Sequence, residues 1–493
     1  MGLYRLFFDN PVLIKHVRSR LRRGPVVTLA VAVLALCAFL TWATFALGGA
    51  DNGTGFWTLL VGQSLLLFVA GSGQATGSLL QARQVGILDF HRISPQRPLA
   101  LVVGFLLGGP IREWLLFAMT VPFGLLLGVW RRPGILGVLA VYTDVVVVAL
   151  LYHALSVCAG LVARVTRQAQ TGVVAFVLVG YFVFGQVLGG VSGPGFLTIL
   201  PTAVSAADRA QTATFFGVAL PVVVHSLLHQ IPILGLTLLA ATRKMRQDQA
   251  AFFSKPQAVL AFAVVAVLLL GDMVGFQPPT GTLASTGVNT AVLGMPAFLL
   301  WLTASIMIAL STPTARELVG GVIRARRAGK SRPGPWDAPA GNTSVMLACS
   351  AILVVTVGVG GLLRGAGAAA LMGGAVAVLT LVYFAAARQA FEVRWKGSGN
   401  GYFALFLFLL WAGPPIAGAI LGIGQRSSAE ALLVSAVSPF VGIWAATSLG
   451  SADFAPAAAG IALGSAAILA VALTQFRLLT ERVTFREAAA DGG

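Results

Sequence analysis

Asp144 lies in the middle third of a long apolar stretch, residues 134–162, beside Tyr142 and Thr143. An ionised carboxylate inside a membrane costs on the order of a few kcal/mol, so it invites a functional interpretation. One interpretation is a carboxylate of a translocation path or a proton relay. The other, which we favour, is a polar contact that orients neighbouring helices.

Two histidines, His225 and His229, are four residues apart and therefore share one face of a helix. This spacing can hold zinc, but a zinc site needs further ligands with the same orientation. The neighbouring sequence offers no carboxylate or cysteine, so we expect these histidines to line a path or to pack. We predict no catalytic residue, no bound cofactor and no metal site in this chain.

The sequence "RRAGKS", residues 326–331, ends like a phosphate-binding loop. Such a loop needs a glycine at position 324, where this chain has Arg324. No strand pattern precedes it. We therefore interpret the segment as a basic loop that faces the inner leaflet or a partner protein.

The composition indicates which elements position these residues. Of 493 residues, 57% are hydrophobic and only 10% are charged, a balance typical of proteins whose solvent is the bilayer. A membrane helix needs roughly 20 apolar residues, and such stretches recur along nearly the whole chain. We predict an all-α, polytopic membrane protein with about twelve transmembrane helices. The spans leave no room for a nucleic-acid-binding domain.

The predicted spans fall into two sets of six. The first set is 26–48, 56–78, 111–129, 134–162, 170–190 and 214–241, and the second is 257–275, 288–311, 343–363, 367–387, 402–423 and 455–476. Two further apolar stretches, 196–207 and 431–449, lie between the fifth and sixth spans of the two sets. We predict that both are re-entrant hairpins.

The distribution of positive charge supports this count. With both termini cytoplasmic and both stretches re-entrant, all but five of the 33 Lys and Arg residues lie inside, as the positive-inside rule requires. The exceptions are Arg131, Arg132, Arg209, Arg364 and Arg426. If both stretches crossed the membrane, the basic segments 242–247 and 324–333 would lie outside.

The two sets repeat one layout, which predicts six-span units at 26–247 and 248–480 and a cytoplasmic tail at 481–493. Each set begins with a basic approach and has a long cytoplasmic connection after its second span, at 79–110 and 312–342. Even numbers of spans make these parallel repeats, related by an axis along the membrane normal.

Residues 1–25 predict an amphipathic interfacial helix. Asn10 can cap it, Pro11 suits its first position, and Gly24-Pro25 would end it. Apolar residues recur at every fourth position: Leu13, Val17 and Leu21. Cationic residues cover the remaining surface, among them Lys15, Arg18 and Arg22. We expect this helix to lie in the headgroup layer, with its arginines facing anionic lipid.

The connection after the second span is longer than a helical hairpin needs. It reads "ARQVGILDFHRISPQRP" from Ala82 to Pro98. We expect "RQVGILDFHRISP" to continue helically beyond the membrane, and a second helix to start with Ser94 as its cap and Pro95 at its first position. A helical connection that leaves the membrane and returns to it offers a surface that a cytoplasmic partner can bind.

This connection resembles the coupling region of ABC-2-type transporter permeases. The resemblance rests on Gly86-Ile87-Leu88-Asp89, on Ser94-Pro95, and on the G-x-x-x-G stretch from Gly104 to Gly108. The interfacial helix, six spans per unit and the stretch Ser438-Pro439-Phe440 fit the same family. The second-half connection keeps Arg316-Glu317 followed by glycines, and it lacks the Leu-acid and Ser-Pro pattern.

The resemblance implies an ATP-driven exporter, which we expect to carry an apolar or amphipathic substrate. ATP and Mg²⁺ would bind a separate ATPase subunit, so the permease itself would be no enzyme. The ATPase would dock on Gly86, Leu88, Asp89, Ser94 and Pro95 and, in the second half, on Arg316 and Glu317. One duplicated chain would supply both transmembrane halves, or two copies would pair as a homodimer.

Two other functions fit a twelve-span chain. Secondary transporters commonly have two parallel halves, and residues 86–92 lie where the major facilitator family keeps a G-x-x-x-D-R motif, although Asp89 comes one residue early. The third alternative is a non-catalytic membrane scaffold. The excess of arginine over lysine, with abundant alanine and glycine, suggests a GC-rich bacterial gene and hence the bacterial cytoplasmic membrane.

Overall fold

The computed structural model describes residues 9–46, 53–129, 133–163, 193–208, 212–248, 250–275, 288–363, 367–394, 399–421 and 429–448, together with Gly464, Ala466 and Ala470. By its internal contacts the chain divides into two compact units. Unit 1 comprises Met1–Thr214 and Val218–Ala250, and unit 2 comprises Phe215–Gly217 and Ala251–Gly493.

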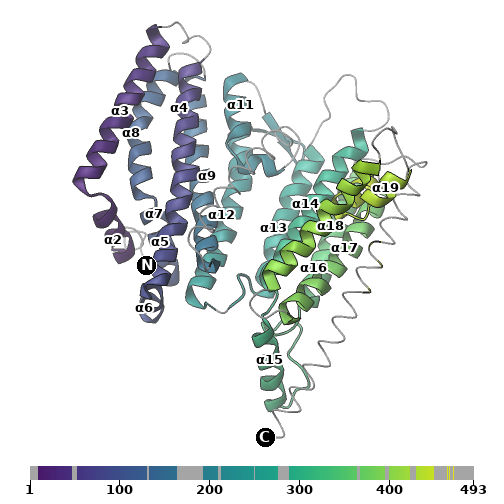
Figure 1. Cartoon of the computed structure of the whole chain (residues 1–493). Helices are drawn as coiled ribbons and strands as arrows, with labels where there is room; N and C mark the ends of the chain where they lie inside the picture. The colour runs from purple at the N-terminus through teal and green to yellow at the C-terminus, as the bar shows by residue number, and fades with distance from the viewer. Residues whose placement is uncertain are drawn as a thin grey trace. The chain divides into compact units, whose positions relative to one another are not determined.

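Helices dominate both units (Figure 1). From its start to Ala250, the chain forms α2 (Pro11–Arg20), α3 (Arg23–Ala46), α4 (Thr54–Ser64), the π-helix η1 (Leu65–Gly71), α5 (Ser72–Gln84), α6 (Ile87–Ile93), α7 (Pro98–Gly108), α8 (Ile111–Val129), α9 (Gly134–Val162), the 3₁₀-helix η2 (Gly193–Leu197), α11 (Leu200–Asp208), β1 (Thr212–Phe215), β2 (Val218–Pro221) and α12 (Val222–Arg246). Beyond Ala250 follow α13 (Lys255–Gly275), α14 (Val288–Ser311), α15 (Ala315–Arg327), α16 (Thr343–Leu363), α17 (Gly367–Arg394), α18 (Gly399–Leu421), α19 (Ala429–Ser435) and α20 (Pro439–Ser448).

Among the described residues, nine helices are long and apolar enough to cross a membrane. A tenth candidate is the pair Met295–Ser311 and Ala315–Arg327, which is bent by 62° at its break. The predicted polytopic helical membrane protein is therefore confirmed at this level. The predicted span 170–190 and the tail 481–493 lie outside the described residues, as does nearly all of the span 455–476.

The last span of the first set begins later than predicted. Residues 214–221 do not open a helix, because β1 and β2 pair as a two-stranded hairpin. Its turn residues Phe216 and Gly217 have φ values of 47° and 80°, as a tight two-residue hairpin turn requires. Helix α12 starts only at Val222. The prediction of a span from residue 214 was wrong at its start.

The two additional apolar stretches each form two short helices. Residues 196–207 are divided between η2 and α11, and residues 431–449 between α19 and α20. The longest of these, α20, has 10 residues and is about 15 Å long, half of the roughly 30 Å hydrocarbon core. Neither stretch forms one continuous spanning helix. Their re-entrant path stays a prediction.

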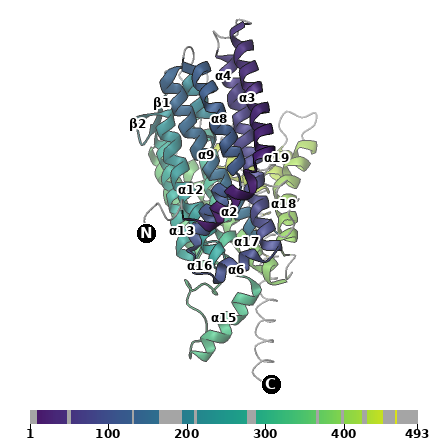
Figure 2. The same ribbon diagram turned by 90° about the vertical axis from the view of Figure 1, so that its left-hand side faces the viewer.

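Helix α9 is the centre of unit 1. In its most apolar window 61% of the residues are buried, against 11% in α3. It contacts α5, α7, α8, α11 and α12, and its inward valines, such as Val141, Val145 and Val148, are fully buried. Figure 2 shows α3, α8 and α9 of unit 1 as long, nearly parallel helices.

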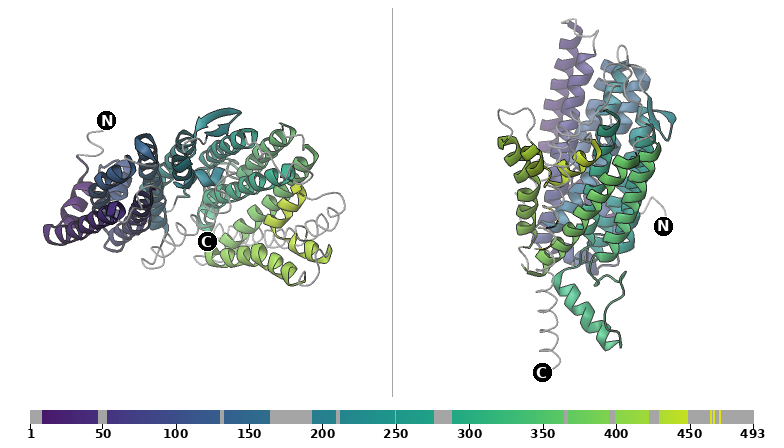
Figure 3. Two further views of the ribbon diagram at one scale, coloured as in Figure 1. Left: turned by 90° about the horizontal axis from the view of Figure 1, so that it is seen from above. Right: turned by 90° about the vertical axis from the view of Figure 1, so that its right-hand side faces the viewer.

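Unit 2 is built around α14, which contacts α13, α16, α17 and α20. Its Trp301 is fully buried, with ring centroids 5.2 Å from Trp411 and 6.4 Å from Phe384. Such edge and tilted arrangements are those that aromatic rings prefer. Figure 3 shows these helices end-on and from the side, with α15 extending beyond the end of the bundle.

Candidate functional site

Residues 85–97 form a hook between α5 and α7, and we use this name below. The helix does not run on from α5 as predicted, because it breaks at Val85-Gly86. Gly86 has φ +75°, a conformation that residues with a β-carbon rarely adopt. Because Gly86 adopts this conformation, the chain changes direction there, and a new helix, α6, starts at Ile87. The predicted excursion is present, but as two helices joined by a hinge.

Ser94 ends α6 instead of starting the next helix. Its hydroxyl donates to the carbonyl of His91 over 2.7 Å, and its backbone is extended, as the residue before a proline prefers. Helix α7 begins at Pro98, with Arg97 at the capping position. The predicted roles of Ser94 as cap and Pro95 as first residue were therefore wrong. Pro98, three residues further on, takes the first position.

The hook exposes an apolar surface. Leu88 anchors α6 with a buried side chain, whereas Val85, Phe90 and Ile93 are 67%, 66% and 84% exposed. Asp89 lies on the exposed side as well, with 73% of its side chain accessible. Neighbouring exposed apolar side chains of this size are typical of a surface that a partner covers.

An ion-pair cluster fixes the hook to α12. The guanidinium of Arg92 lies 2.9 Å from one carboxylate oxygen of Asp248 and also pairs with Asp89 at 2.8 Å. Arg83, at the end of α5, lies 3.4 Å from Asp248 and donates to the carbonyl of Leu161 at the end of α9. We call Arg83, Arg92 and Asp248 the clamp, because together they join α5 and α6 to the residues that follow α12.

Helix α2 begins as predicted. The Oδ1 of Asn10 accepts hydrogen bonds from the backbone N–H groups of Val12 and Leu13, and Pro11 occupies the first position. The Asn10 amide also donates to the carbonyl of Ala100, just before the G-x-x-x-G stretch, over 2.6 Å. Asn10 therefore caps α2 and ties it to α7.

The glycines of the G-x-x-x-G stretch receive α2. A β-carbon at Gly104 would meet Val12 and Asn10, and one at Gly108 would meet His16. His16 also lies 5.5 Å from Phe105, edge to face. Burial, with smaller contributions from Arg20 and Lys15, lowers the pKa of His16 to about 4. The histidine is therefore neutral at neutral pH and packs as a small aromatic side chain.

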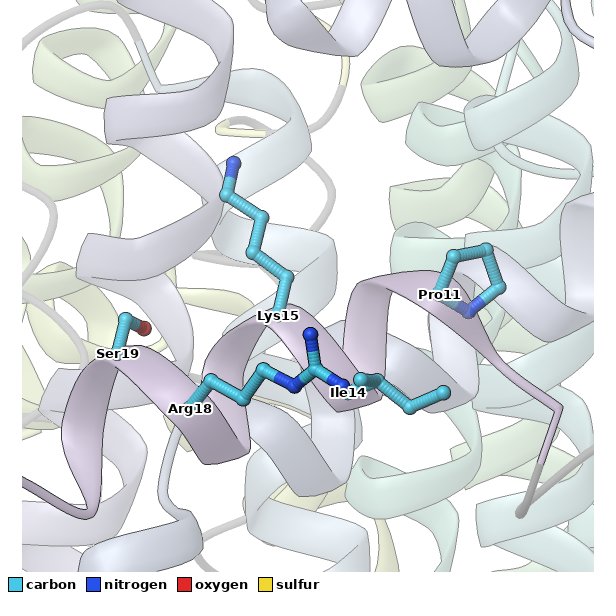
Figure 4. Close-up of a pocket in the computed structure, with 5 residues that line it drawn as sticks. All are labelled: Pro11, Ile14, Lys15, Arg18 and Ser19. Carbon is cyan, nitrogen blue, oxygen red and sulfur yellow. The ribbon is translucent and has the colours of Figure 1, made fainter.

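The outward side of α2 carries the predicted cations. An open groove of about 490 Å³ is lined by Pro11, Ile14, Lys15, Arg18 and Ser19. Figure 4 shows the Arg18 side chain lying along the helix toward Ile14 while Lys15 projects away from it. Arg22 follows in the short break before α3 and is exposed. Gly24 and Pro25 lie in the first turn of α3, so their predicted role as the end of α2 was wrong.

Asp144 is fully buried in unit 1, where α9 meets α12. Its Oδ1 accepts a hydrogen bond of 2.5 Å from the side-chain amide of Gln230. The same amide nitrogen donates to the carbonyl of Phe196 over 2.9 Å. The favoured interhelical polar contact is thus present, and the candidate role in a translocation path stays a prediction.

His225 and His229 stack on each other with ring centroids 4.9 Å apart. The ring of Phe196 lies 4.1 Å from His225 and 5.4 Å from His229, and His229 Nδ1 contacts the carbonyl of His225 at 3.0 Å. The shared helix face predicted from their spacing is confirmed. The stack gives both rings a packing role, and their lining of a path stays a prediction.

His153 supports the π-helix. Its Nε2 lies 2.9 Å from the carbonyl of Leu67, in the middle of η1, and Trp114 contacts the same ring edge to face at 5.6 Å. A π-helix changes the pairing of backbone carbonyls, and a side chain that reaches one of them stabilises the bulge. Sequence reasoning missed this role, because the spacing gave no sign of η1.

Glu317 and Arg316 lie in the first turn of α15. Thr314 Oγ1 accepts from the backbone N–H of Glu317 at 3.3 Å, and the Glu317 carboxylate accepts from the backbone N–H of Thr314 at 2.9 Å. This reciprocal arrangement is a capping box. The structure therefore gives Glu317 a local role, while the predicted coupling role of both residues stays a prediction.

Asp248 and Gln230 were not expected from the sequence. Asp248 directly follows the basic segment 242–247, and an acid at the end of a basic run is a weak signal for an ion pair. Gln230 is one turn from Ser226 and His225 on an apolar helix, where an amide is rarer than a leucine. Their partners lie 86 to 165 residues away in sequence, so spacing could not reveal them.

Comparison of the chain with protein-family models, with curated proteins and with solved structures gave no match. The assignment of a function therefore rests on the residues and geometry described above.

Proposed function

We propose that the chain is the transmembrane permease subunit of an ATP-driven transporter of the ABC-2 type, with a separate ATPase docked on the hook. The observation that carries the proposal is the hook itself. It combines an exposed apolar surface, formed by Val85, Phe90 and Ile93, with rigid attachment to the helices behind it. A docking surface that transmits force needs both properties.

The attachments define how a pull on the hook would reach the membrane helices. Leu88 is buried, and the clamp joins α6 to the end of α12. At the other end, α7 is joined to α2 through Gly104 and Gly108. Motion of an ATPase bound to α6 would therefore move α5, α7 and α12 together, and α2 with them.

In this proposal the chain crosses a bacterial cytoplasmic membrane twelve times. Two six-span units, each with a re-entrant hairpin, place both termini in the cytoplasm. ATP and Mg²⁺ bind the ATPase subunit, and this chain exports an apolar or amphipathic substrate. The cationic groove of α2 faces anionic lipid. One chain forms both halves of the path, or two copies pair.

Co-purification tests the proposal. The full chain, extracted in mild detergent from its own cells, is expected to bring with it an ATPase subunit. Phe90→Ala with Ile93→Ala should weaken this association at least tenfold, because each apolar side chain buried on binding contributes roughly 1.5–3 kcal/mol. Trp336→Ala is the control, since Trp336 is an exposed aromatic residue outside the hook. Recruitment of no ATPase, or equal recruitment by all variants, would contradict the proposal.

A secondary transporter is the second candidate, because the buried Asp144–Gln230 pair is a feature that ion-driven carriers use. Transport by proteoliposomes that contain this chain alone separates the two. Uptake driven by an ion gradient without ATP would favour the carrier, whereas uptake that needs an added ATPase and ATP would favour the permease.

A further inference from the structure

The side chains of Asp144 and Gln230 are both fully buried in unit 1. They are joined by one hydrogen bond, from Gln230 Nε2 to Asp144 Oδ1. Each side chain has a second oxygen, Asp144 Oδ2 and Gln230 Oε1. Among the described residues, neither of these two buried oxygens has a hydrogen-bond donor.

An ionised carboxylate and an amide oxygen are both acceptors, so they cannot bond to each other. Leaving such atoms buried without a donor costs free energy on the order of 1–3 kcal/mol each, and more for a charged group. A single proton on Asp144 Oδ2 would remove both deficits. The neutral acid would then donate from Oδ2 to Gln230 Oε1 while Gln230 Nε2 donates to Oδ1, which is a paired acid–amide arrangement.

We propose that Asp144 and Gln230 form a proton-binding site inside unit 1. Asp144 Oδ2 carries the proton and Gln230 is the positioning residue that accepts from it. This inference does not depend on the permease function, because it rests on the two side chains alone.

The surrounding oxygens favour a proton over a metal ion. The hydroxyls of Thr202 and Ser226 bond to each other at 3.1 Å, and the carbonyl of Phe196 already accepts from Gln230. Two oxygens remain without a donor, whereas oxygen-bound metal ions in proteins take about six ligands or more. A proton needs two.

Other titratable groups lie on the helices around α9. His225 and His229 are on α12 and stack with Phe196. The remaining titratable groups are Arg243, Lys244 and Arg246 at the end of α12, Asp208 at the end of α11, Arg112 and Glu113 on α8, Arg83 on α5, and Tyr142, His153 and Cys158 on α9 itself. The Asp144 carboxylate has two side-chain hydrogen-bond partners, Thr202 on α11 and Gln230 on α12.

Infrared difference spectroscopy on the purified full chain tests the proposal. As the pH is lowered from about 8 to about 5, the expected result is a growing carbonyl stretch of a protonated carboxylic acid that shifts in D₂O. Asp144→Asn should remove this band, and Gln230→Leu should move it to the frequency of an acid without an amide partner. Asp89→Asn is the control, because Asp89 is exposed and should not contribute to the band.

A second measurement keeps the test independent of any folding defect. Asparagine at position 144 can make the same paired contact with Gln230 without a titratable proton. The melting temperature of Asp144→Asn should therefore match wild type in acid, where Asp144 is protonated in the folded and the unfolded chain, and fall less than wild type as the pH rises. Absence of the band in wild type, its persistence in Asp144→Asn, or its loss on adding Na⁺ at constant pH would overturn the proposal.

Discussion

Val12 of α2 occupies the space that a side chain at Gly104 of α7 would need. A β-carbon built at Gly104 would lie 2.7 Å from the Val12 β-carbon and 2.9 Å from Asn10 Oδ1. Helix α2 is thus fixed to the helix that follows the hook.

Gly104→Leu should displace α2 and lower the melting temperature by several degrees, since overpacking of this kind costs about 1–3 kcal/mol. Gly62→Leu is the matched control, because a β-carbon at Gly62 has open space around it. Thermal unfolding in detergent measures both. Equal melting temperatures for the two variants would show that α2 is not held by this contact.

The α2–α7 contact should weaken in acid. The pKa of His16 is lowered to about 4 from an ordinary value of 6.5, so the unfolded chain binds more protons than the native one between these values. The stabilising effect is complete above about pH 6.5 and is lost as the pH falls toward 4. His16→Phe keeps an aromatic ring that cannot ionise. Its melting temperature should fall less than that of wild type between about pH 7 and pH 5. Parallel curves would argue against a titrating His16.

Asp248→Asn should loosen the hook. It removes the negative charge that Arg83 and Arg92 share, and partly exposed ion pairs contribute about 0.2–1 kcal/mol each. Amide hydrogen exchange in residues 86–94 should become a few-fold faster. Asp89→Asn, which removes an exposed partner of Arg92, should have a smaller effect. If exchange in 86–94 is unchanged by Asp248→Asn, the clamp does not hold α6.

The capping box should matter for α15. Thr314→Ala or Glu317→Ala should cost about 1 kcal/mol of helix stability and speed amide exchange in residues 315–320. Arg316→Gln is the control, because Arg316 takes no part in the capping box. If ATPase recruitment also falls with Arg316→Gln while exchange stays slow, residue 316 has the predicted coupling role.

The long apolar helices could be predicted from the sequence. The bounds of α8 and α9, Ile111–Val129 and Gly134–Val162, match the predicted spans because proline, glycine and charge punctuate them. The cap of α2 was readable for the same reason, since Asn10-Pro11 is a local signal. Hairpin β1–β2 was not, because a short apolar strand beside an apolar helix has no distinct composition.

The inward face of α2 illustrates what periodicity leaves open. Leu13, Val17 and Leu21 were predicted as the apolar stripe, yet Val12 is the buried residue and His16 the one that packs on α7. Both stripes have helical spacing. Periodicity shows which side chains share a face of the helix. It does not show which face packs against the rest of the protein. Here that choice depends on the space that Gly104 and Gly108 leave on α7, which exists only in the folded state.

The contacts of Asp144, Gln230 and Asp248 could not be predicted from the sequence, for a different reason. Each joins residues that are distant in the chain, and one sequence does not record which distant residues meet. Asp144 could be singled out as a buried carboxylate from its depth in a span. Its partner could be found only once α9 and α12 were side by side.

The wide turns of η1, Leu65–Gly71, set the direction in which the hook points around the axis of α5. Each residue of an ordinary α-helix turns the chain by about 100°. If these residues wound as ordinary α-helix instead, each would turn the chain further than it does in a π-helix, and everything from Ser72 to Ile93 would be rotated around the axis. Arg83 and Arg92 would then point away from Asp248, although no residue of the clamp had been altered.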